Sequence, residues 1–417
     1  MSERTLDQWL EWFEHVHPLE MDLRLDRVEE VSKHLGIRHL PCPVITVGGT
    51  NGKGSTVSYL ESIYRQAGYK TGATISPHIL RFNERIRVNG EDVDDERLCR
   101  WFSEVEAKRG DVALTFFEFA ILGAVYGFVE SGVDVIILEV GLGGRLDAAN
   151  LWDADVAVVT NVSLDHEQWL GRGRDAIGRE KAGIARAGRP CVVGDLDPPF
   201  GLTTQLQAIG CDLIQNGVDY LVRDLDEQFT IDGYGEFPRP GMIGHWQLSN
   251  AACAVIASTA LSDRLPVSKA HQAAGIADTV VTGRMQVREV AGRQVMFDVG
   301  HNPAAAQMGV DAIKAISPKG RVLAVSAIMS DKAYQEVAAL WCQAVDVWYV
   351  GNLQMSRALK SSVYTEVLNE LNAEVTDHPQ LIDAFDQALS DSEPGDLVVV
   401  FGSFYTVEAV MRHLQPS

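Results

Sequence analysis

One stretch decides the fold: Val47-Gly48-Gly49-Thr50-Asn51-Gly52-Lys53-Gly54-Ser55-Thr56. The apolar residues 44–47 before it predict a strand, and residues 55–67 after it predict a helix. Glycines in such a turn let backbone N–H groups face phosphate oxygens, the helix N-terminus adds positive potential, and Lys53 can reach the terminal phosphates. We therefore expect a phosphate-binding loop.

The spacing of this loop differs from the common GxxxxGK[ST] pattern. Only three residues separate Gly48 from Gly52, and Gly54 intervenes before the hydroxyls of Ser55 and Thr56. The alternative is a glycine-rich turn without a ligand. The predicted strand and helix, together with the lysine and the hydroxyls, favour the ligand. The expected nucleotide contacts of the loop are Gly49, Thr50, Asn51, Gly52, Lys53, Gly54, Ser55 and Thr56.

Short Val- and Ile-rich runs alternate with longer segments of helical period along the whole chain, which is typical of parallel strands buried between helices. The sequence therefore predicts the α/β class, with a nucleotide-binding domain built on a parallel sheet. Residues 206–240 become irregular and strand-like before a helix begins near Leu248, and we expect them to decorate this domain. Its expected strands are 44–47, 71–75, 133–140, 156–161 and 191–194, and its helices include 55–67 and 116–130.

A second series of strands starts near Gln294 and predicts a smaller, C-terminal Rossmann-like α/β domain. We place a hinge at 282–284, where a glycine follows a helical segment and precedes the new strands. The expected division is a P-loop domain at 1–281 and a C-terminal domain at 282–417, in agreement with about 150 residues per domain. The expected strands of the second series are 295–298, 322–325, 345–350 and 397–401.

Composition limits the classes of partner. A net charge of -21 argues against a nucleic-acid surface, which needs a concentrated basic patch. The longest apolar runs are strand-sized, well short of the roughly 18 to 20 residues of a membrane span, so we expect no membrane partner. The six cysteines form no CxxC pair, and the chain opens without an apolar run behind a basic flank. We expect a cytoplasmic protein without a signal peptide.

Several further blocks of sequence carry a family resemblance. Together with the GTNGKGS loop they resemble the Mur ligase and folylpolyglutamate synthase superfamily, and in particular the bifunctional dihydrofolate synthase/folylpolyglutamate synthases of bacteria. The resemblance covers nearly the whole chain. The blocks are TLDQWL at 5–10, His17-Pro18, DLRLDRV at 22–28, SPH at 76–78, NER at 83–85, TFFE at 115–118, LEVGLGGRLD at 138–147, LDH at 164–166, GREKAG at 178–183, DVGHNP at 298–303 and FGSF at 401–404.

Metal ligands are expected at strand ends, because Mg²⁺ prefers oxygen ligands beside substrate phosphates. Glu139 and Ser76 fit that requirement. The resemblance implies that both, with His166, hold two magnesium ions that bridge ATP and substrate, and Ser55 or Thr56 adds a hydroxyl. A structural ion pair for Glu139 and an ordinary histidine at 166 are the alternatives.

Lys181 lies in a segment that otherwise indicates only a charged helical face. The resemblance implies that this lysine is carbamylated and then holds a magnesium ion. It also implies that Asn250 contacts adenine, Arg284 grips phosphate and Asp298 lies on the ribose side. Asn250 as a simple helix cap is the alternative. The family usually has Pro-Gly-Arg at the hinge, whereas this chain has Thr282.

The resemblance also implies a reaction. A carboxylate needs activation before an amine can attack it, and phosphoryl transfer from ATP supplies an acyl phosphate, with Lys53 and Lys181 in catalytic roles. Thr115 and Phe117 resemble the segment that packs on the pterin. Asp147 can hydrogen-bond a pterin edge, and Phe117 as a core aromatic is the alternative.

His301 is expected to position phosphate or glutamate, although its His-Asn-Pro motif also suits a helix start. We expect ligation of L-glutamate to dihydropteroate and to the glutamate tail of reduced folates. A folylpolyglutamate synthase without the first activity is one alternative, and a peptidoglycan Mur ligase is another. About 45 residues before the loop are too few for the additional N-terminal domain of the Mur enzymes. A nucleotide-dependent switch would leave Glu139, His166 and Lys181 unexplained. A monomer is expected.

Overall fold

The computed structural model describes residues 4–16 and 22–415. His17 and Pro18, which form one block of the family resemblance, lie outside the described residues. The chain divides into two compact units. Unit 1 comprises Met1–His78, Phe82–Gly241 and Gln247–Thr279, and unit 2 comprises Ile79–Arg81, Met242–Trp246 and Val280–Ser417.

Unit 1 is built on a sheet whose strands lie in the order β4-β3-β2-β5-β1-β6-β7-β8. From β2 to β8 neighbouring strands are parallel, and the β4-β3-β2 edge is antiparallel. Strand β1 lies between β5 and β6, so the glycine-rich loop begins at the carboxyl edge of the sheet, where ligands bind in such folds. The strands are β1 Val44–Gly48, β2 Thr71–Thr74, β3 Ile86–Val88, β4 Glu91–Asp92, β5 Val135–Glu139, β6 Val156–Val159, β7 Pro190–Val193 and β8 Asp212–Gln215.

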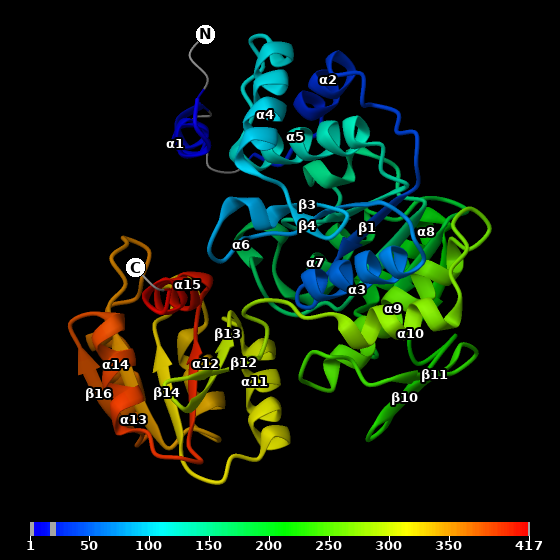
Figure 1. Ribbon diagram of the computed structural model, residues 1–417. Helices are drawn as coiled ribbons and strands as arrows, with labels where there is room; N and C mark the ends of the chain where they lie inside the picture. Colours follow the sequence, from blue (N-terminus) through cyan, green and yellow to red (C-terminus); the bar gives the residue numbers. More distant parts are fainter. Residues whose placement is uncertain (1–3, 17–21, 416–417) are drawn as a thin grey trace. The chain divides into compact units, whose positions relative to one another are not determined.

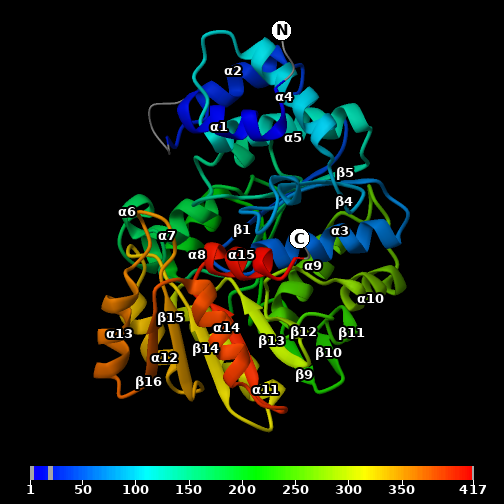
Figure 2. The same ribbon diagram turned by 60° about the vertical axis from the view of Figure 1, so that its left-hand side comes forward.

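Helices cover both faces of this sheet. In Figures 1 and 2, α4 and α5 lie on one side of the strands, and α3, α9 and α10 lie on the other. The aromatic core under α1, α4 and α5 includes Trp9, Phe13, Phe102 and Phe119. The helices are α1 Leu6–Val16, α2 Asp26–His34, α3 Lys53–Gln66, α4 Asp95–Arg109, α5 Phe116–Ser131, α6 Glu167–Leu170, α7 Gly173–Ala182, α8 Phe200–Ile209, α9 Trp246–Ala260 and α10 Lys269–Asp278, with short 3-10 turns η1 Phe82–Arg85 and η2 Ala148–Leu151.

The segment expected to be irregular is more ordered than the sequence indicates. Its first part forms α8 and β8, and β8 extends the main sheet. The rest forms a separate antiparallel sheet in the order β11-β10-β9. The strands are β9 Val222–Leu225, β10 Gln228–Ile231 and β11 Gly235–Pro238.

Unit 2 has its own sheet in the order β12-β13-β17-β14-β15-β16, parallel except for the edge strand β12. One apolar core lies under α11, α12 and α13, and another lies under α14 and α15. The strands are β12 Gln286–Val290, β13 Arg293–Asp298, β14 Val322–Ser326, β15 Val347–Gly351, β16 Glu374–His378 and β17 Leu397–Phe401. The helices are α11 Pro303–Ile316, α12 Tyr334–Trp341, α13 Ser361–Glu370, α14 Leu381–Asp391 and α15 Phe404–His413.

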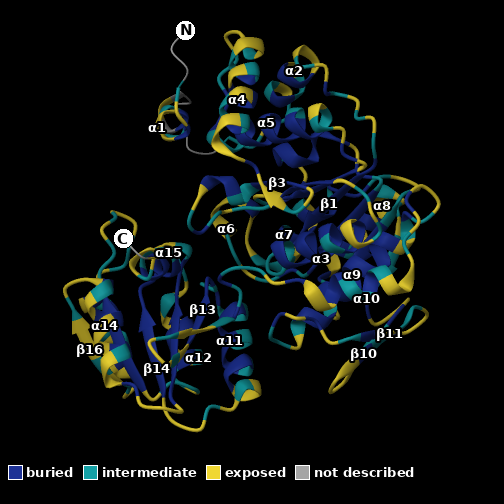
Figure 3. Ribbon diagram, viewed as in Figure 1, coloured by how far each residue is buried: buried dark blue, intermediate teal, exposed yellow. Residues whose placement is uncertain are grey.

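The α/β class is confirmed, together with a largely parallel sheet in the N-terminal part of the chain and a second one in the C-terminal part. The start of the second strand series near Gln294 is wrong, because β12 precedes it, and β16 is missing from the expected strands. Both are edge strands with exposed, mixed polar sequences, whereas the interior strand β14 is buried throughout (Figure 3). Apolar runs in the sequence therefore predict the interior strands of a sheet better than its edge strands. In the part of the chain that the structure describes, no helix is long and apolar enough to cross a membrane.

Candidate active site

The glycine-rich loop joins β1 to α3 in a conformation that only glycine tolerates at two points. Gly49 has a φ of 142° and Gly52 a φ of 84°. A Cβ at Gly49 would lie 1.9 Å from Thr160 Oγ1, and a Cβ at Gly52 would lie 2.3 Å from Asn250 Oδ1. The loop therefore needs glycine for its left-handed backbone and for close contact with its neighbours.

Two lysines meet the carbonyl side of the loop. Lys53 Nζ donates to the carbonyls of Gly49 and Thr50 at 3.3 and 3.1 Å. Lys181 Nζ, from α7, donates to the Gly49 carbonyl at 2.8 Å. Burial, with the charge of Lys53, lowers the pKa of Lys181 to about 7. A substantial fraction of Lys181 is therefore a neutral amine at neutral pH, and a neutral amine is nucleophilic.

Glu139 ends β5 beside the loop, where it is paired in register with Val47 of β1. Its Oε2 accepts the backbone N–H of Ser76 at 2.8 Å. A Cβ at Gly54 would lie 3.7 Å from the same oxygen. The structure thus brings Glu139 and Ser76, two of the expected metal-binding residues, together, with the buried Glu139 carboxylate next to the start of α3.

Ser55 and Asn250 belong to one chain of side-chain contacts. Asn250 Nδ2 donates to Gln247 Oε1 at 3.0 Å, and Gln247 Nε2 donates to Ser55 Oγ at 3.4 Å. Thr56 Oγ1 donates instead to the Gly52 carbonyl at 3.0 Å. Asn250 lies inside α9 and contacts the loop, so the alternative of a simple helix cap is wrong.

His166 precedes α6 with a φ of 54°, and its Nε2 lies 3.8 Å from Asp165 Oδ1. Among residues 4–16 and 22–415, no three His, Cys, Asp or Glu side chains gather closely enough to hold a metal ion. Glu139, Ser55 and Ser76 nevertheless offer the oxygen ligands that Mg²⁺ prefers beside waters and substrate phosphates, whereas His166 would add a nitrogen ligand.

A cavity adjoins Glu139 and Ser76, and its wall includes Arg85 and Phe117. Phe117 is partly buried in the first turn of α5, which Thr115 and Glu118 close with a reciprocal capping box. Phe117 therefore both packs against the core and faces the cavity. The other residues that line the cavity are Thr74, Ile75, Ile86, Ala120 and Ile121.

Asp147 lies beside Phe117, since a Cβ at Gly141 would lie 2.8 Å from Phe117 Cζ and 3.3 Å from Asp147 Oδ2. Its carboxylate accepts the N–H groups of Leu142 and Ala149 at 2.8 and 2.9 Å. Burial nevertheless raises the pKa of Asp147 to about 6, against the opposing effects of these bonds and of Lys53. A carboxyl group with this pKa can donate or accept a hydrogen bond near neutral pH.

Within unit 2, the expected residues Arg284, Asp298 and His301 gather at the carboxyl end of β13. Asp298 Oδ2 accepts the Gly300 N–H at 2.9 Å, and burial raises the pKa of this carboxyl while the Arg284 charge opposes the rise. The Arg284 guanidinium lies 5.2 Å from the centre of the Phe404 ring. His301 Nδ1 lies 3.0 Å from the Val299 carbonyl oxygen.

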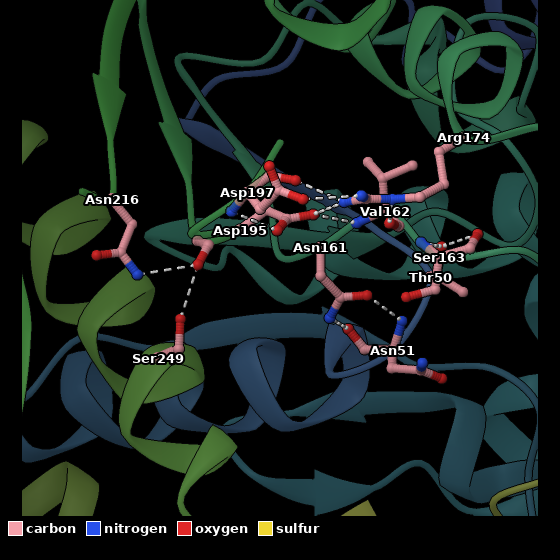
Figure 4. A network of polar contacts seen from close by, with 11 residues as sticks. Thr50, Asn51, Asn161, Val162, Ser163, Arg174, Asp195, Asp197, Asn216 and Ser249 are labelled. Carbon is pink, nitrogen blue, oxygen red and sulfur yellow. Dashed lines mark hydrogen bonds and ion pairs between the residues drawn. The ribbon is translucent and has the colours of Figure 1, made fainter. Parts of the chain in front are cut away.

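Sequence reasoning missed the residues that surround the loop. Thr160, Asn161 and Ser163, directly after β6, hydrogen-bond loop residues Thr50 and Asn51, as Figure 4 shows for most of these contacts. The sequence offers only a polar run after a buried strand, which does not distinguish a site from an ordinary turn. Because β6 pairs with β1, that run had to end beside the loop. Gln247, one helical turn before Asn250, was missed in the same way.

Comparison with known proteins identifies the family. Residues 47–258 match the Mur ligase middle domain, and residues 283–404 match the Mur ligase glutamate ligase domain. The chain is 42% identical to the dihydrofolate synthase/folylpolyglutamate synthase of Escherichia coli K12, over 98% of this chain and 95% of that protein. The chain belongs to the dihydrofolate synthase/folylpolyglutamate synthase family.

Solved structures agree with this membership. The structure of E. coli FolC in complex with DHPP and ADP matches with a TM-score of 0.93 and 40% identity, over 99% of this chain and 98% of that one. A Yersinia pestis bifunctional folylpolyglutamate synthase/dihydrofolate synthase, complexed with AMPPNP and Mn, matches with a TM-score of 0.90 and 36% identity, over 99% and 98% of the chains. The family resemblance in the sequence is confirmed, and the dihydrofolate synthase/folylpolyglutamate synthase family consists of ATP-dependent ligases.

Proposed function

We propose that this chain ligates L-glutamate to dihydropteroate, giving dihydrofolate, and to the glutamate tail of reduced folates, with conversion of ATP to ADP and phosphate. One observation carries the proposal: Glu139 lies between the phosphate loop and a cavity whose wall includes Phe117. A phosphate site and an aromatic-walled cavity that share one carboxylate suit phosphoryl transfer to an acid, and the cavity of about 20 Å³ has to widen to admit that acid.

The loop and its lysines would bind ATP and stabilise the transferring phosphoryl group. Backbone N–H groups at the start of α3 would face the phosphates, and the Lys53 ammonium would offset the charge that moves during transfer. The amine of glutamate then attacks the acyl phosphate, forms the amide and releases phosphate. Arg284 and Asp298 stay predicted nucleotide contacts, and His301 stays a predicted positioning residue.

Two magnesium ions are part of the proposal. Ser55, Ser76, Glu139, His166 and a carbamylated Lys181 would hold them, and bound Mg²⁺ would neutralise charge on the phosphates. The low pKa of Lys181 supports carbamylation, because only the neutral amine reacts with carbon dioxide. A plain amine at Lys181 in active enzyme would contradict this assignment.

Thr115, Phe117 and Asp147 would recognise the pterin. Phe117 offers a stacking face, and the Asp147 carboxyl can hydrogen-bond a heterocycle edge, since it lies beside that ring. Solved structures of E. coli FolC, one in complex with DHPP and ADP and one with ADP but without folate substrate, support a folate substrate for this chain. A folylpolyglutamate synthase without dihydrofolate synthase activity is the second candidate. It is favoured by the likeness to a Mycobacterium tuberculosis protein, 25% identical, that is named only as a folylpolyglutamate synthase.

The test is phosphate release from Mg-ATP with L-glutamate and either dihydropteroate, tetrahydrofolate or no pterin, with product masses read in parallel. We expect release with both pterins and a glutamate-sized mass added to each. Turnover with only one pterin would leave a single activity. Hydrolysis without pterin or ligation would support a nucleotide switch and contradict the proposal.

Loss of turnover in Glu139→Gln, with magnesium-dependent nucleotide binding weakened and the fold retained, would support the metal assignment. Full activity of Glu139→Gln would contradict the assignment of Glu139 as a metal ligand. Cytoplasmic location, a monomeric state and the domain boundary between residues 281 and 282 also stay proposals.

A further inference from the structure

Asn161 makes a two-point contact with the phosphate loop. Its side-chain Oδ1 accepts the backbone N–H of Asn51 at 3.1 Å, and its Nδ2 donates to the Asn51 carbonyl at 2.8 Å (Figure 4). One amide side chain thereby fixes both polar groups of one loop residue. A rotation of the Asn51 backbone would break both bonds together.

The strip 160–163 makes further bonds to the loop. The Thr50 N–H donates to the Asn161 carbonyl at 2.9 Å, and Thr160 Oγ1 donates to the Asn51 carbonyl at 2.6 Å. Ser163 N–H donates to Thr50 Oγ1 at 3.0 Å. Loop residues 50 and 51 are thus held along the strip, at the carboxyl ends of the neighbouring strands β1 and β6.

A charged pair holds the strip from its other side. Asp195 Oδ2 accepts the Val162 N–H at 2.9 Å, and Arg174 Nε donates to the Val162 carbonyl at 2.8 Å. Arg174 Nη2 also lies 3.3 Å from Asp195 Oδ2, and Nη1 lies 3.1 Å from Asp197 Oδ2. Figure 4 shows these side chains converging on Val162 from the end of β7 and the start of α7.

The same strip continues through Leu164 and Asp165 to His166. It therefore links the phosphate loop to a residue proposed to hold magnesium. A loop already held in its binding conformation loses less conformational freedom when phosphates bind, so its fixation strengthens binding.

We propose that Asn161 is a positioning residue of the phosphate loop, and that Arg174 and Asp195 keep its strip in place. Asn161 is not a catalytic residue, because its contacts are to the loop backbone. The inference rests on the proposed function in one respect, that the loop binds the phosphates of a nucleotide.

A merely structural role for Asn161 predicts a different result. The bonds would then stabilise the fold, and their loss would lower the melting temperature without changing nucleotide affinity. Asn352 offers a matched control, since it also is half-buried, accepts a backbone N–H, from Ser361 at 3.0 Å, and donates to Ser361 Oγ at 2.8 Å.

The experiment is calorimetric titration of Mg-ADP into folded protein, with melting temperatures and steady-state kinetics measured alongside. Asn161→Ala should weaken Mg-ADP binding about 10-fold to 30-fold, as expected for two lost hydrogen bonds at about a factor of five each. The KM for Mg-ATP should rise in parallel, while the KM for L-glutamate stays within about 2-fold. Asn352→Ala should lower the melting temperature and leave Mg-ADP affinity unchanged.

A second pair of variants tests the contacts of Arg174 and Asp195 with Val162. Asp195→Asn should weaken Mg-ADP binding about 3-fold, less than Asn161→Ala, because it acts through Val162. Asp232→Asn, which alters the exposed Arg223–Asp232 pair, should have no effect. If Asn161→Ala does not fold, Asn161→Ser replaces it, since serine stays polar but cannot reach both groups of Asn51.

Parent-like Mg-ADP affinity in the folded Asn161 variant would overturn the inference, and parent-like affinity in Asp195→Asn would remove the outer pair from it. Failure of the parent protein to bind Mg-ADP would instead contradict the proposed function. The two failures are therefore distinguishable.

Discussion

The starts of α3 and α11 occupy equivalent positions in the two units, since each helix follows a buried strand of a largely parallel sheet. Asn302 caps α11, because its side chain accepts the Ala305 N–H at 2.9 Å, and Pro303 has no N–H to satisfy. Gly52 precedes α3 in a left-handed conformation and, as a glycine, supplies no capping side chain to this helix. One helix start has an N-cap side chain from its own sequence, whereas the other begins after a glycine, which has no side chain to serve as a cap.

This difference shows why strand-loop-helix topology alone does not identify a phosphate site. Both starts have the partial positive charge of a helix N-terminus. At α11 the chain supplies its own acceptor, so the sequence gains stability there. At α3 the sequence instead supplies glycines and Lys53, which costs local stability and creates affinity for an anion.

Lys53→Ala tests the start of α3 and has the largest expected effect. Removing a donor aimed at moving negative charge costs on the order of 10³-fold in turnover. We expect such a loss of ligation rate with an unchanged melting temperature. Lys269→Ala is the control, since Lys269 likewise is the first residue of its helix but lies exposed on α10. Equal turnover in the two variants would contradict the assignment of the phosphate site to α3.

Each unit also holds a buried carboxyl with a raised pKa, and Asp147 allows a quantitative test. Burial raises the folded pKa of Asp147 from its ordinary value of 3.8 to about 6, so the folded state binds the proton more tightly than the unfolded state does. The stability from this group is fully present below about pH 4 and is lost as pH rises through 6. At about 1.4 kcal/mol per pH unit, the loss approaches 3 kcal/mol.

Asp147→Asn removes this pH dependence. Urea unfolding at pH 4 and pH 7.5 should show the variant gaining up to about 3 kcal/mol relative to the parent protein between these values. Asp298→Asn provides the comparison in unit 2, and its gain should have the same sign, since burial raises that pKa as well. A parent-minus-variant difference that is independent of pH would show that the folded Asp147 carboxyl ionises normally.

Gly52→Ala tests whether the start of α3 needs a glycine. A residue with a Cβ in a left-handed conformation costs roughly 1 to 2 kcal/mol, and here the Cβ would also collide with Asn250 Oδ1. Gly188→Ala is the matched control, because Gly188 has a φ of 63° and no atom lies within 4 Å of the position that its Cβ would take. Gly52→Ala should lose more stability than Gly188→Ala in urea unfolding, because only its Cβ meets a neighbouring side chain, and only Gly52→Ala should weaken Mg-ADP binding. Unchanged binding would mean that the loop adapts.

Much of this arrangement could be predicted from the sequence, and the exceptions have physical reasons. The loop and the buried strands can be predicted from the sequence, because glycine spacing and apolar runs are local signals. The strip at Asn161 and the pair Arg174–Asp195 gave no such signal, since polar side chains after a strand are as common in ordinary turns. Their role depends on strand order, which places β6 beside β1, and strand order is a property of the folded chain.

Asn302→Ala tests the N-cap of α11 and has the smallest expected effect. Loss of an N-cap side chain costs about 1 kcal/mol, so the urea midpoint should fall slightly while the denaturant slope stays constant. Asn302→Ser, which retains a capping oxygen, should restore most of the loss. A loss equal in alanine and serine variants would mean that the cap does not stabilise α11. The contrast between the two helix starts would then rest on the glycines and Lys53 of α3 alone.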